Sequence, residues 1–572
     1  MDKSNKKLTR RNFLKTAAIA GAAGAMTSCV TTGHGESGGK LLWDKEADVV
    51  ILGYGGAGAC AGITAREAGA SVLIIEKQEE ATHYSNTRMS GGIYHCPDKT
   101  GNKQALKEYA KAMFSGENIP GKLEGEQPDV SDGLAEAWAE YTPGLTDWLK
   151  SLDSEFVTIE RPGFKGAAFP NFPGAKESGY AVVAASYTGK LGGGPTKHLP
   201  KNQTENGEAL WRNLDGACKA KGAQVMYETS GVSLITDSNG EIIGINARSE
   251  KTGALLKIKA NRGVILSSGG YEYNEAMRRA FLEGPGVEGW AFYGTTHNTG
   301  AGIEMAIKVG AKLVKVGKAA SRMITAVPLR AHGMKIGVIT PVVGQANSMV
   351  VDNSGHRFAA EHKVTRDPSR YFFYKEGVKF DIDTLTYPRI PSWLIFDETM
   401  RSTKCITELR ASVAAYDYVP WTADNMDAVN RGWILKGNTL EELADKIRKH
   451  PENFEKMTTK DLVNAVKKYN EACTKGDDVE FKRDPKTLGP VEKAPFYALP
   501  LYPGGPNTKG GIASDAARHV LDWENKPIPR LFCAGEIASA LKFVYQGGGN
   551  LTECMVFGRI AGASAAAMKP WA

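Results

Sequence analysis

The sequence lacks the cysteine patterns that hold metals or covalent haem. Its eight cysteines are scattered over 572 residues, and none belongs to a Cys-x-x-Cys or Cys-x-x-Cys-His motif. Iron–sulfur clusters, zinc ribbons and c-type haem all need such closely spaced ligands. We therefore expect no metal site and no covalent haem, and cysteines this sparse do not indicate a disulfide framework.

The chain also has little net charge and no long apolar run. The formal net charge is +7, but residues 1–29 hold six Lys or Arg and one Asp, so that the remainder carries only +2. Proteins that bind nucleic acids normally carry a strong basic excess, and we expect no nucleic-acid partner. Beyond residue 29, no segment approaches the roughly 20 apolar residues of a membrane-spanning helix. With 42% hydrophobic residues, the length predicts a globular protein of several domains.

The first residues are typical of an export signal. Residues 9–15, Thr-Arg-Arg-Asn-Phe-Leu-Lys, precede a weakly apolar, Ala- and Gly-rich stretch over 16–26. This pattern resembles a twin-arginine signal, which predicts a periplasmic or other extracytoplasmic location. The four residues that end at Cys29 resemble a lipoprotein cleavage box with Met in place of Leu, so membrane attachment would come only from a lipid on Cys29. An ordinary basic tail is the alternative, and residues 30–45 are interpreted as a linker.

A glycine-rich turn follows the first strongly apolar segment. In order, the sequence predicts a buried strand (47–52), a turn (Gly53, Gly55 and Gly58), a helix (61–70), a second strand (71–77) and a terminal acid (Glu76). Glycines allow a pyrophosphate to approach the backbone at a helix N-terminus, and an acid after the second strand can hold ribose hydroxyls. The order of these parts predicts a Rossmann-like, nucleotide-binding α/β domain.

A second glycine-rich region lies near the C-terminus. Residues 528–567 predict a strand that reaches Gly535 and Glu536, a glycine turn over 547–549 and a long helix of small residues. With this region, the chain resembles the superfamily of FAD-dependent fumarate reductases, 3-ketosteroid dehydrogenases and succinate dehydrogenase flavoproteins over nearly all of its length after residue 45. Further matching segments are "SNTRMSGG" (85–92), "GVILSSGGYEYN" (263–274), "TGAGIEMAIKVGAKL" (299–313), "NSGHRFAAE" (353–361) and "YNEACTKGDDVEF" (469–481).

The resemblance implies that FAD is the cofactor, and it assigns residues to each part of FAD. For the diphosphate and the adenosine, these are Gly53, Gly55, Gly56, Ala57, Gly58, Glu76, Lys77 and Val232. For the dinucleotide turn, the ribityl chain and the flavin edge, they are Asn86, Thr87, Ser90, Gly91, Gly92, Ser268, Gly269, Glu536, Gly549, Asn550 and Leu551. The positive end of the last helix could also stabilise charge on the reduced flavin.

The domain organisation follows from the same resemblance. We predict an α/β, Rossmann-like FAD-binding domain over 46–312 and 500–572, with an inserted α+β capping domain over 313–499 that closes over the flavin. Within the cap, Thr439 and Glu442 form a capping-box pattern at the start of a helix.

Arg366 is the candidate proton donor. Fumarate reductases use an arginine in a Thr-Arg-Asp context shortly after an Arg-Phe-x-x-Glu motif, and this chain has that motif over 357–361, followed by Thr365-Arg366-Asp367. One residue is inserted between Glu361 and Arg366 relative to the usual spacing. The alternative for Arg366 is a surface ion pair with Asp367 or Glu361.

The turn over 545–549 departs from that of fumarate reductases. Lys542 and Gln546 stand where those enzymes have the His and Arg that bind a substrate carboxylate, which argues against fumarate itself. Tyr545 and Gly549 instead resemble a pair in ketosteroid dehydrogenases, in which a tyrosine hydroxyl and a glycine N–H bind a ketone oxygen. They would polarise a substrate carbonyl, although Tyr545 could alternatively pack on the flavin.

Three functions remain open. The first is an exported FAD-dependent reductase of the C=C bond in α,β-unsaturated carbonyl or carboxylate compounds, supplied with electrons by an external quinol-linked cytochrome or haem protein. The second is the reverse reaction, in which a ketosteroid-type dehydrogenase uses a base such as Tyr371 or Tyr374. The third is a flavin-carrying binding protein without turnover.

Overall fold

The computed structural model describes residues 42–116, 132–159, 169–184, 205–364, 370–407 and 421–571. The predicted export signal, Cys29 and Arg366 lie outside the described residues, as does the side chain of Tyr371. Among the described residues, no helix has both the length and the hydropathy needed to span a bilayer.

Within the described residues, the largest sheet has eight strands, six of them in the order β18-β19-β9-β1-β2-β6. The six are β1 Lys45–Leu52, β2 Val72–Ile75, β6 Gln224–Met226, β9 Leu255–Leu266, β18 His519–Leu521 and β19 Pro527–Cys533. Strand β1 pairs in parallel with β2 and β9, and β19 pairs in parallel with β9. Val49, Val50 and Ile51 are fully buried, as in a parallel sheet that is covered on both faces.

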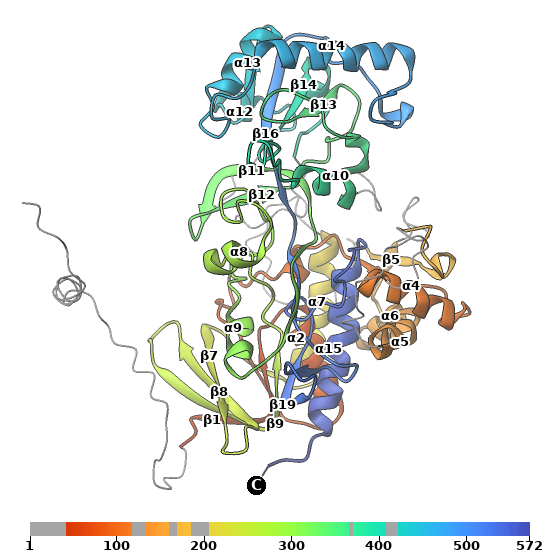
Figure 1. Cartoon of the computed structure of the whole chain (residues 1–572). Helices are drawn as coiled ribbons and strands as arrows, with labels where there is room; N and C mark the ends of the chain where they lie inside the picture. Colours follow the sequence, from red (N-terminus) through yellow and green to blue (C-terminus); the bar gives the residue numbers. More distant parts are fainter. Residues whose placement is uncertain are drawn as a thin grey trace, which may run out of the picture. The chain divides into compact units, whose positions relative to one another are not determined.

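An antiparallel ribbon of β7 (Thr229–Thr236) and β8 (Ile242–Ser249) extends this sheet from β9 (Figure 1). Strands from the N-terminal and C-terminal parts of the chain thus share one sheet. The carboxyl ends of β1, β2, β9 and β19 point to the same edge because these strands are parallel. Ligand sites of open α/β sheets lie at this edge.

Helices of small residues cover one face of the sheet. Helix α2 (Gly56–Glu67) packs against α15 (Gly549–Ala567) and α7 (Glu205–Ala220), and the three lie together in Figure 1. A Cβ atom on Gly558 or Gly562 would lie 2.6 Å from the carbonyl oxygen of Ala57 or 2.3 Å from that of Ala61. Helix α15 therefore needs Gly558 and Gly562 because the backbones of α2 and α15 approach each other closely.

A second sheet has the strand order β12-β11-β16-β14-β13, with β15 also paired to β16. Its strands are β11 Arg322–Ala331, β12 Met334–Val338, β13 Ser348–Val351, β14 Ser392–Asp397, β15 Leu435–Gly437 and β16 Phe496–Gly504. Helices α13 (Leu440–Arg448) and α14 (Thr459–Lys475) pack on it through a core that includes Trp393 and Tyr469. The predicted helix cap is confirmed, because the Glu442 amide donates to Thr439 Oγ1 at 3.2 Å.

Shorter elements complete the described structure. The remaining strands are β3 Ile93–His95, β4 Thr158–Ile159, β5 Tyr180–Val183, β10 Leu313–Ala319 and β17 Thr508–Ile512. The remaining α-helices are α3 Asn86–Met89, α4 Lys103–Ser115, α5 Asp132–Tyr141, α6 Leu145–Leu152, α8 Glu275–Phe281, α9 Ala301–Lys308, α10 Arg370–Gly377, α11 Glu398–Thr403 and α12 Met426–Asn430.

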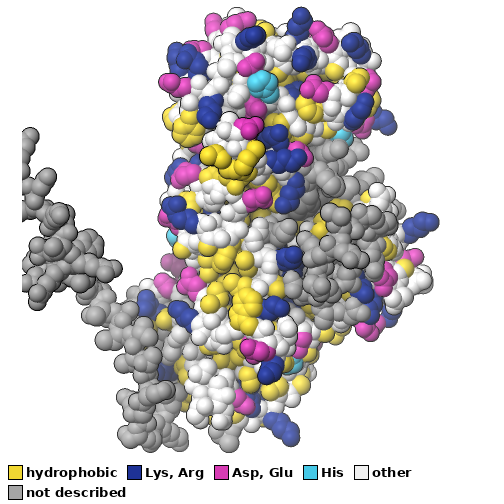
Figure 2. Space-filling model, viewed as in Figure 1, with side chains coloured by type: hydrophobic (Ala, Val, Ile, Leu, Met, Phe, Trp, Pro, Cys, Tyr) yellow, Lys and Arg dark blue, Asp and Glu magenta, His cyan; other side chains and the backbone are white. Residues whose placement is uncertain are grey.

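The predicted domain boundaries stay a prediction. Strand β16 runs through position 500 and pairs within the second sheet, whereas β18 and β19 pair in the first sheet. Figure 2 shows basic and acidic side chains interspersed over the face of the molecule in view.

Candidate cofactor and substrate site

A cavity of about 410 Å³ lies at the carboxyl edge of the first sheet. It is lined by the residues that directly follow β1, β2 and β9, where parallel strands present their ligand-binding edge. Twelve of the residues that the resemblance assigns to FAD line it: Gly53, Gly55, Gly56, Ala57, Glu76, Lys77, Asn86, Thr87, Val232, Ser268, Gly269 and Glu536. The structure thus gathers them around one space.

The glycine turn permits backbone contacts that no side chain would allow. Gly53 has φ +95°, and a Cβ there would lie 2.8 Å from the carbonyl oxygen of Ser267. A Cβ on Gly58 would lie 2.1 Å from the carbonyl oxygen of Gly53. Gly58 does not line the cavity but lies behind the turn, so its role is to let α2 begin directly against the end of β1. Helix α2 has Gly55 as N-cap, which has no side chain to cap the helix. The Gly56 amide donates to Thr87 Oγ1 at 3.0 Å, and the helix N-terminus lines the cavity, where it suits an anionic ligand.

One end of the cavity is built around Glu76. The Glu76 carboxylate is 6% exposed and accepts the Tyr54 amide at 2.9 Å and the Gln78 amide at 3.0 Å. These bonds fix its orientation and leave lone pairs free for ribose hydroxyls. Beside it, burial lowers the pKa of His83, which favours the neutral ring. Among the described residues, its Nε2 atom has no hydrogen-bond partner.

Lys77 and His297 lie along the same part of the cavity. The Lys77 ammonium donates to Thr299 Oγ1 at 3.1 Å, and burial lowers its pKa. Burial also lowers the pKa of His297 to about 4. Glu250 and Arg248 also line the cavity, and the Glu250 carboxylate acts on Lys77. The cavity wall thus contains carboxylates, cations and two imidazoles whose pKa values are lowered.

The other end of the cavity is built around Glu536, at the end of β19. Its Oε2 atom accepts the side-chain amides of Asn86 at 3.3 Å and Asn298 at 3.4 Å. Ser268 Oγ is buried and, within the described part of the chain, has no hydrogen-bond partner. Buried polar atoms without a partner are rare, so Ser268 Oγ and His83 Nε2 fit a cavity that is completed by a polar ligand with several hydrogen-bonding groups.

The remaining predicted residues lie outside the cavity lining. These are Gly58, Ser90, Gly91, Gly92, Tyr545, Gly549, Asn550 and Leu551. Most of them gather where β3 meets the turn over 545–549. The His95 amide donates to Thr552 Oγ1 at 2.8 Å, and a Cβ on Gly548 would lie 3.1 Å from the Ile93 carbonyl oxygen.

The side chain of Gln546 anchors this turn to the protein interior. Its side chain is fully buried, accepts a hydrogen bond from the Tyr109 hydroxyl, and donates to the Tyr180 hydroxyl and to Ser178 Oγ. The side chain therefore points into the protein, although its position in sequence matches a substrate-binding arginine. Gln546 also accepts the Gly549 amide on its backbone carbonyl at 2.9 Å, so a substrate oxygen at Gly549 would share that amide.

A buried ion pair supports the other side of the turn. Lys509 and Glu553 approach to 2.6 Å, and both side chains are 1% exposed. The Lys509 ammonium also lies 5.1 Å from the centroid of the Tyr545 ring, within the range of a cation–π interaction. Because charge pair, ring and turn are all buried, Tyr545 has a fixed place at the N-terminus of α15.

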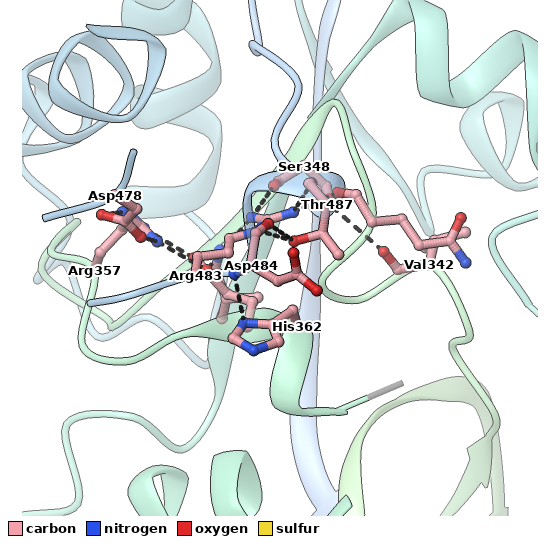
Figure 3. Close-up of polar contacts among 11 residues, drawn as sticks. Val342, Ser348, Arg357, His362, Asp478, Arg483, Asp484 and Thr487 are labelled. Atoms are coloured by element: carbon pink, nitrogen blue, oxygen red, sulfur yellow. Dashed lines mark hydrogen bonds and ion pairs between the residues drawn. The ribbon is translucent and has the colours of Figure 1, made fainter. Parts of the chain in front are cut away.

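A network of charges holds the segment that precedes Arg366 (Figure 3). Arg357 pairs with Glu361 at 2.8 Å and with Asp478 at 2.9 Å. Arg483 approaches Glu361 at 3.4 Å and donates to the Ser348 carbonyl at 2.8 Å. Burial alone would raise the pKa of Glu361, but the two guanidinium groups lower it overall. Glu361 is thus already paired with two arginines.

The candidate bases of the reverse reaction lie on α10. Burial raises the pKa of Tyr374, which is 2% exposed and packs its ring against Trp290 at 6.0 Å between centroids. A phenol in this setting resists ionisation. The Tyr371 side chain lies outside the described residues.

Comparison with known proteins identifies the family of this chain. The model of the FAD binding domain family matches residues 48–551. The chain belongs to this FAD-binding family. The glycine turn, Glu76 and the two partnerless polar atoms of the cavity are the groups with which such a family member would meet its cofactor.

The relatives include both a fumarate reductase and a ketosteroid dehydrogenase, the two kinds of enzyme in the predicted resemblance. A probable fumarate reductase of Shewanella frigidimarina is 26% identical over 91% of this chain and 75% of its own length. A 3-oxosteroid 1-dehydrogenase of Mycolicibacterium smegmatis is 26% identical over 91% of this chain and 98% of its own length.

The crystal structure of a 3-ketosteroid Δ1-dehydrogenase from Sterolibacterium denitrificans shares the fold. It has a TM-score of 0.72 at 23% identity and covers 91% of this chain and 100% of its own. The comparisons confirm the predicted fold class, the superfamily and FAD as the cofactor. They also confirm the class of enzyme, an FAD-dependent oxidoreductase that acts on CH–CH groups.

Several residues of the site were missed from the sequence. Tyr54 lies inside the glycine motif, and His83 lies two residues before the segment 85–92. His297 and Asn298 directly precede the segment 299–313. In the sequence, only their position next to the matching segments could have indicated a role at the site. The contacts that bring them to the cavity are made with other strands and cannot be read from the local sequence.

Proposed function

We propose that this FAD-dependent oxidoreductase reduces the C=C bond of an α,β-unsaturated carbonyl or carboxylate compound. The observation that carries the proposal is the fixed turn over 545–549, which presents Tyr545 at the N-terminus of α15. The turn is held by the buried Gln546 side chain and by the Lys509–Glu553 pair. A rigid donor at a helix N-terminus suits an oxygen that gains negative charge during the reaction.

Reduction adds a hydride to one carbon and a proton to its neighbour. FAD, when bound, supplies the hydride. The Tyr545 hydroxyl donates a hydrogen bond to the carbonyl oxygen, and the Gly549 amide, shared with the Gln546 carbonyl, assists it. Arg366 gives the proton to the neighbouring carbon, which requires cationic or buried surroundings that make its guanidinium more acidic.

The substrate in this proposal is bulkier or less charged than a C4 dicarboxylate. The Gln546 amide group is saturated by Tyr109, Ser178 and Tyr180. It therefore offers nothing to a carboxylate at the position of the family arginine. A ketone or a single acyl group fits the remaining donors better than a second carboxylate does.

The dehydrogenase direction is the second candidate, because the same two donors would serve a saturated ketone. It needs a base to remove a proton, and the raised pKa of Tyr374 disfavours that residue. Anaerobic assays separate the two directions. If the enzyme oxidises a chemically reduced dye with an enone as acceptor, the reductase is supported. If it reduces an oxidised dye with a saturated ketone as donor, and no enone oxidises the reduced dye, the dehydrogenase is supported.

We further propose export by the twin-arginine route, with electrons delivered outside the cytoplasm by a quinol-linked cytochrome or haem protein. The N-terminal pattern over 9–29 supports this. Replacing Arg10 and Arg11 by lysine should retain the protein in the cytoplasm, as measured by cell fractionation. Replacing Cys29 by serine should release it from membranes if that residue is lipidated.

The Tyr545→Phe variant tests the proposed carbonyl donor. Loss of one preorganised donor typically costs about 100- to 1,000-fold in kcat, and we expect such a loss with an enone while the FAD content stays unchanged. If Tyr545 only packs against the flavin, the phenylalanine ring would pack in the same way and kcat would change little. Tyr387→Phe, in the second half of the chain and packed on Phe380, is the matched control and should keep full activity.

The Gln546→Arg variant tests the exclusion of dicarboxylates. Because the side chain is fully buried among Tyr109, Ser178 and Tyr180, an arginine there would be an unpaired buried charge. We expect the free energy of unfolding to fall by about 3 kcal/mol or more, measured by denaturant titration, with no gain of fumarate reduction. Gln104→Arg on the exposed face of α4 should be neutral. A stable variant that reduces fumarate would contradict the assigned orientation.

A further inference from the structure

Two carboxyl groups meet at the wall of the cavity. Glu272 is fully buried, and Glu536 lines the cavity. The Thr508 amide donates to Glu272 Oε1 at 2.5 Å and to Glu536 Oε1 at 3.2 Å. A Cβ on Gly270 would lie 2.1 Å from Glu536 Oε1 and 2.9 Å from Glu272 Oε1. The two carboxyl groups therefore converge on the same small region of backbone.

The donors around this pair do not satisfy two carboxylates. Glu536 accepts Thr508 Oγ1 at 3.2 Å in addition to the two asparagine amides. Glu272 Oε2 is buried and, among the described residues, accepts no hydrogen bond. Burial and then the neighbouring Glu272 raise the pKa of Glu536. Two carboxyl groups in such contact retain a proton because both cannot ionise.

The surrounding charges do not replace that proton. The groups that face the pair are Tyr271 and Tyr273 on its own loop, Arg278 on α8, Lys509 on β17, and Glu553 and Cys554 on α15. Arg278 donates to the backbone carbonyls of Gly286, Val287 and Trp290. Lys509 is paired with Glu553 at 2.6 Å. Arg278 also donates to the Glu272 backbone carbonyl at 3.2 Å. Within the described residues, the hydrogen bonds of Arg278 thus go to backbone carbonyls, and Lys509 is paired with a different carboxylate.

We propose that Glu272 and Glu536 share one proton, and that the protein binds FAD only while this proton is present. Glu272 is then a positioning residue, which holds the proton against the carboxyl group that faces the cofactor. Loss of the proton would place a second negative charge in a buried pair beside a ligand that already carries an anionic diphosphate. Repulsion within the pair would also move Glu536 away from Asn86 and Asn298.

The sign of the pH dependence follows from the raised pKa. The favourable state is fully present below the usual pKa of a glutamate and is lost as pH rises through the raised pKa. The holoenzyme should therefore release FAD at alkaline pH. For a linkage to one proton, the dissociation constant rises at most tenfold per pH unit. The inference rests on FAD binding and is independent of the direction of the reaction.

The test measures FAD release from the diluted holoenzyme between about pH 6 and about pH 9, a range in which ordinary carboxyl groups stay ionised. Free FAD is collected by filtration and quantified at one fixed pH. In the wild-type protein we expect the logarithm of the dissociation constant to rise with pH, with a slope approaching one. In Glu272→Gln the slope should vanish, because the introduced side-chain amide donates permanently to Glu536.

Two further variants make the result decisive. Glu304→Gln changes an exposed carboxylate on α9 and should keep the wild-type slope. Glu536→Gln should bind FAD more weakly than the wild type at about pH 6 and should also show no slope, which covers the case of a misfolded Glu272→Gln. A flat wild-type profile, or equal slopes in the wild type and in either pair variant, would overturn the shared proton. Uniformly weaker binding with an unchanged slope would reduce Glu272 to a packing role.

Discussion

Replacing Gly58 by alanine should give a protein that is purified without flavin. The added Cβ would lie 2.1 Å from the Gly53 carbonyl oxygen and 2.9 Å from Ser267 Oγ. The first of these is backbone at the end of β1, which is fixed by its pairing with β2 and β9. The start of α2 would have to move away from the strand, and with it the amide groups that would bind the FAD diphosphate.

The measurement is the ratio of flavin to protein absorbance after purification. We expect a loss of at least 100-fold in FAD affinity, which is about 2.7 kcal/mol. This corresponds to the loss of about one or two hydrogen bonds to a charged group. Gly144→Ala is the matched control, because its added Cβ meets no atom within 4 Å, and it should retain FAD in full. Stoichiometric FAD in Gly58→Ala would show that α2 tolerates the shift and that the turn is not what positions the cofactor.

The glycine turn could be predicted from the sequence because its parts are local. Gly53, Gly58 and Glu76 lie within one strand–turn–helix–strand unit, and each follows from covalent geometry and hydrogen bonding over a short stretch of chain. The sequence order also indicated that Glu536 returns to the same site, which the pairing of β19 with β9 provides. The local pattern thus predicted where each residue lies relative to its own strand.

The partners of Gln546 and Glu536 could not be predicted in this way. Gln546 accepts from Tyr109, 437 positions away, and Glu272 meets the Thr508 amide across 236 positions. No periodicity links such residues, because their contact depends on how α4, β5 and β17 pack. An alignment of motifs placed Gln546 where a substrate ligand would lie, but burial turns its side chain into the protein. The motif therefore predicted that Gln546 lies in the turn, but it did not predict the direction of the Gln546 side chain.

Replacing Arg366 by glutamine should abolish most of the proposed ene-reduction while leaving FAD bound. General acid catalysis contributes about 100- to 10,000-fold, so we expect kcat to fall by that factor with an enone and a chemically reduced dye under anaerobic conditions. Glu361, its potential ion-pair partner, is fully buried and is already paired with Arg357 and Arg483.

The same variant separates the reductase from its alternatives. In a dehydrogenase with a tyrosine base, Arg366→Gln would leave turnover of saturated ketones within about threefold of the wild type, since an uninvolved surface substitution costs little. In a binding protein without turnover, neither the wild type nor the variant would oxidise the dye. Arg431→Gln, which removes a cation whose side chain is 45% exposed and paired with Asp427, controls for the loss of charge and should keep full activity. An unchanged kcat in Arg366→Gln would remove the proton donor from the mechanism, whereas Tyr545 and the FAD cavity would keep their places because neither depends on that guanidinium.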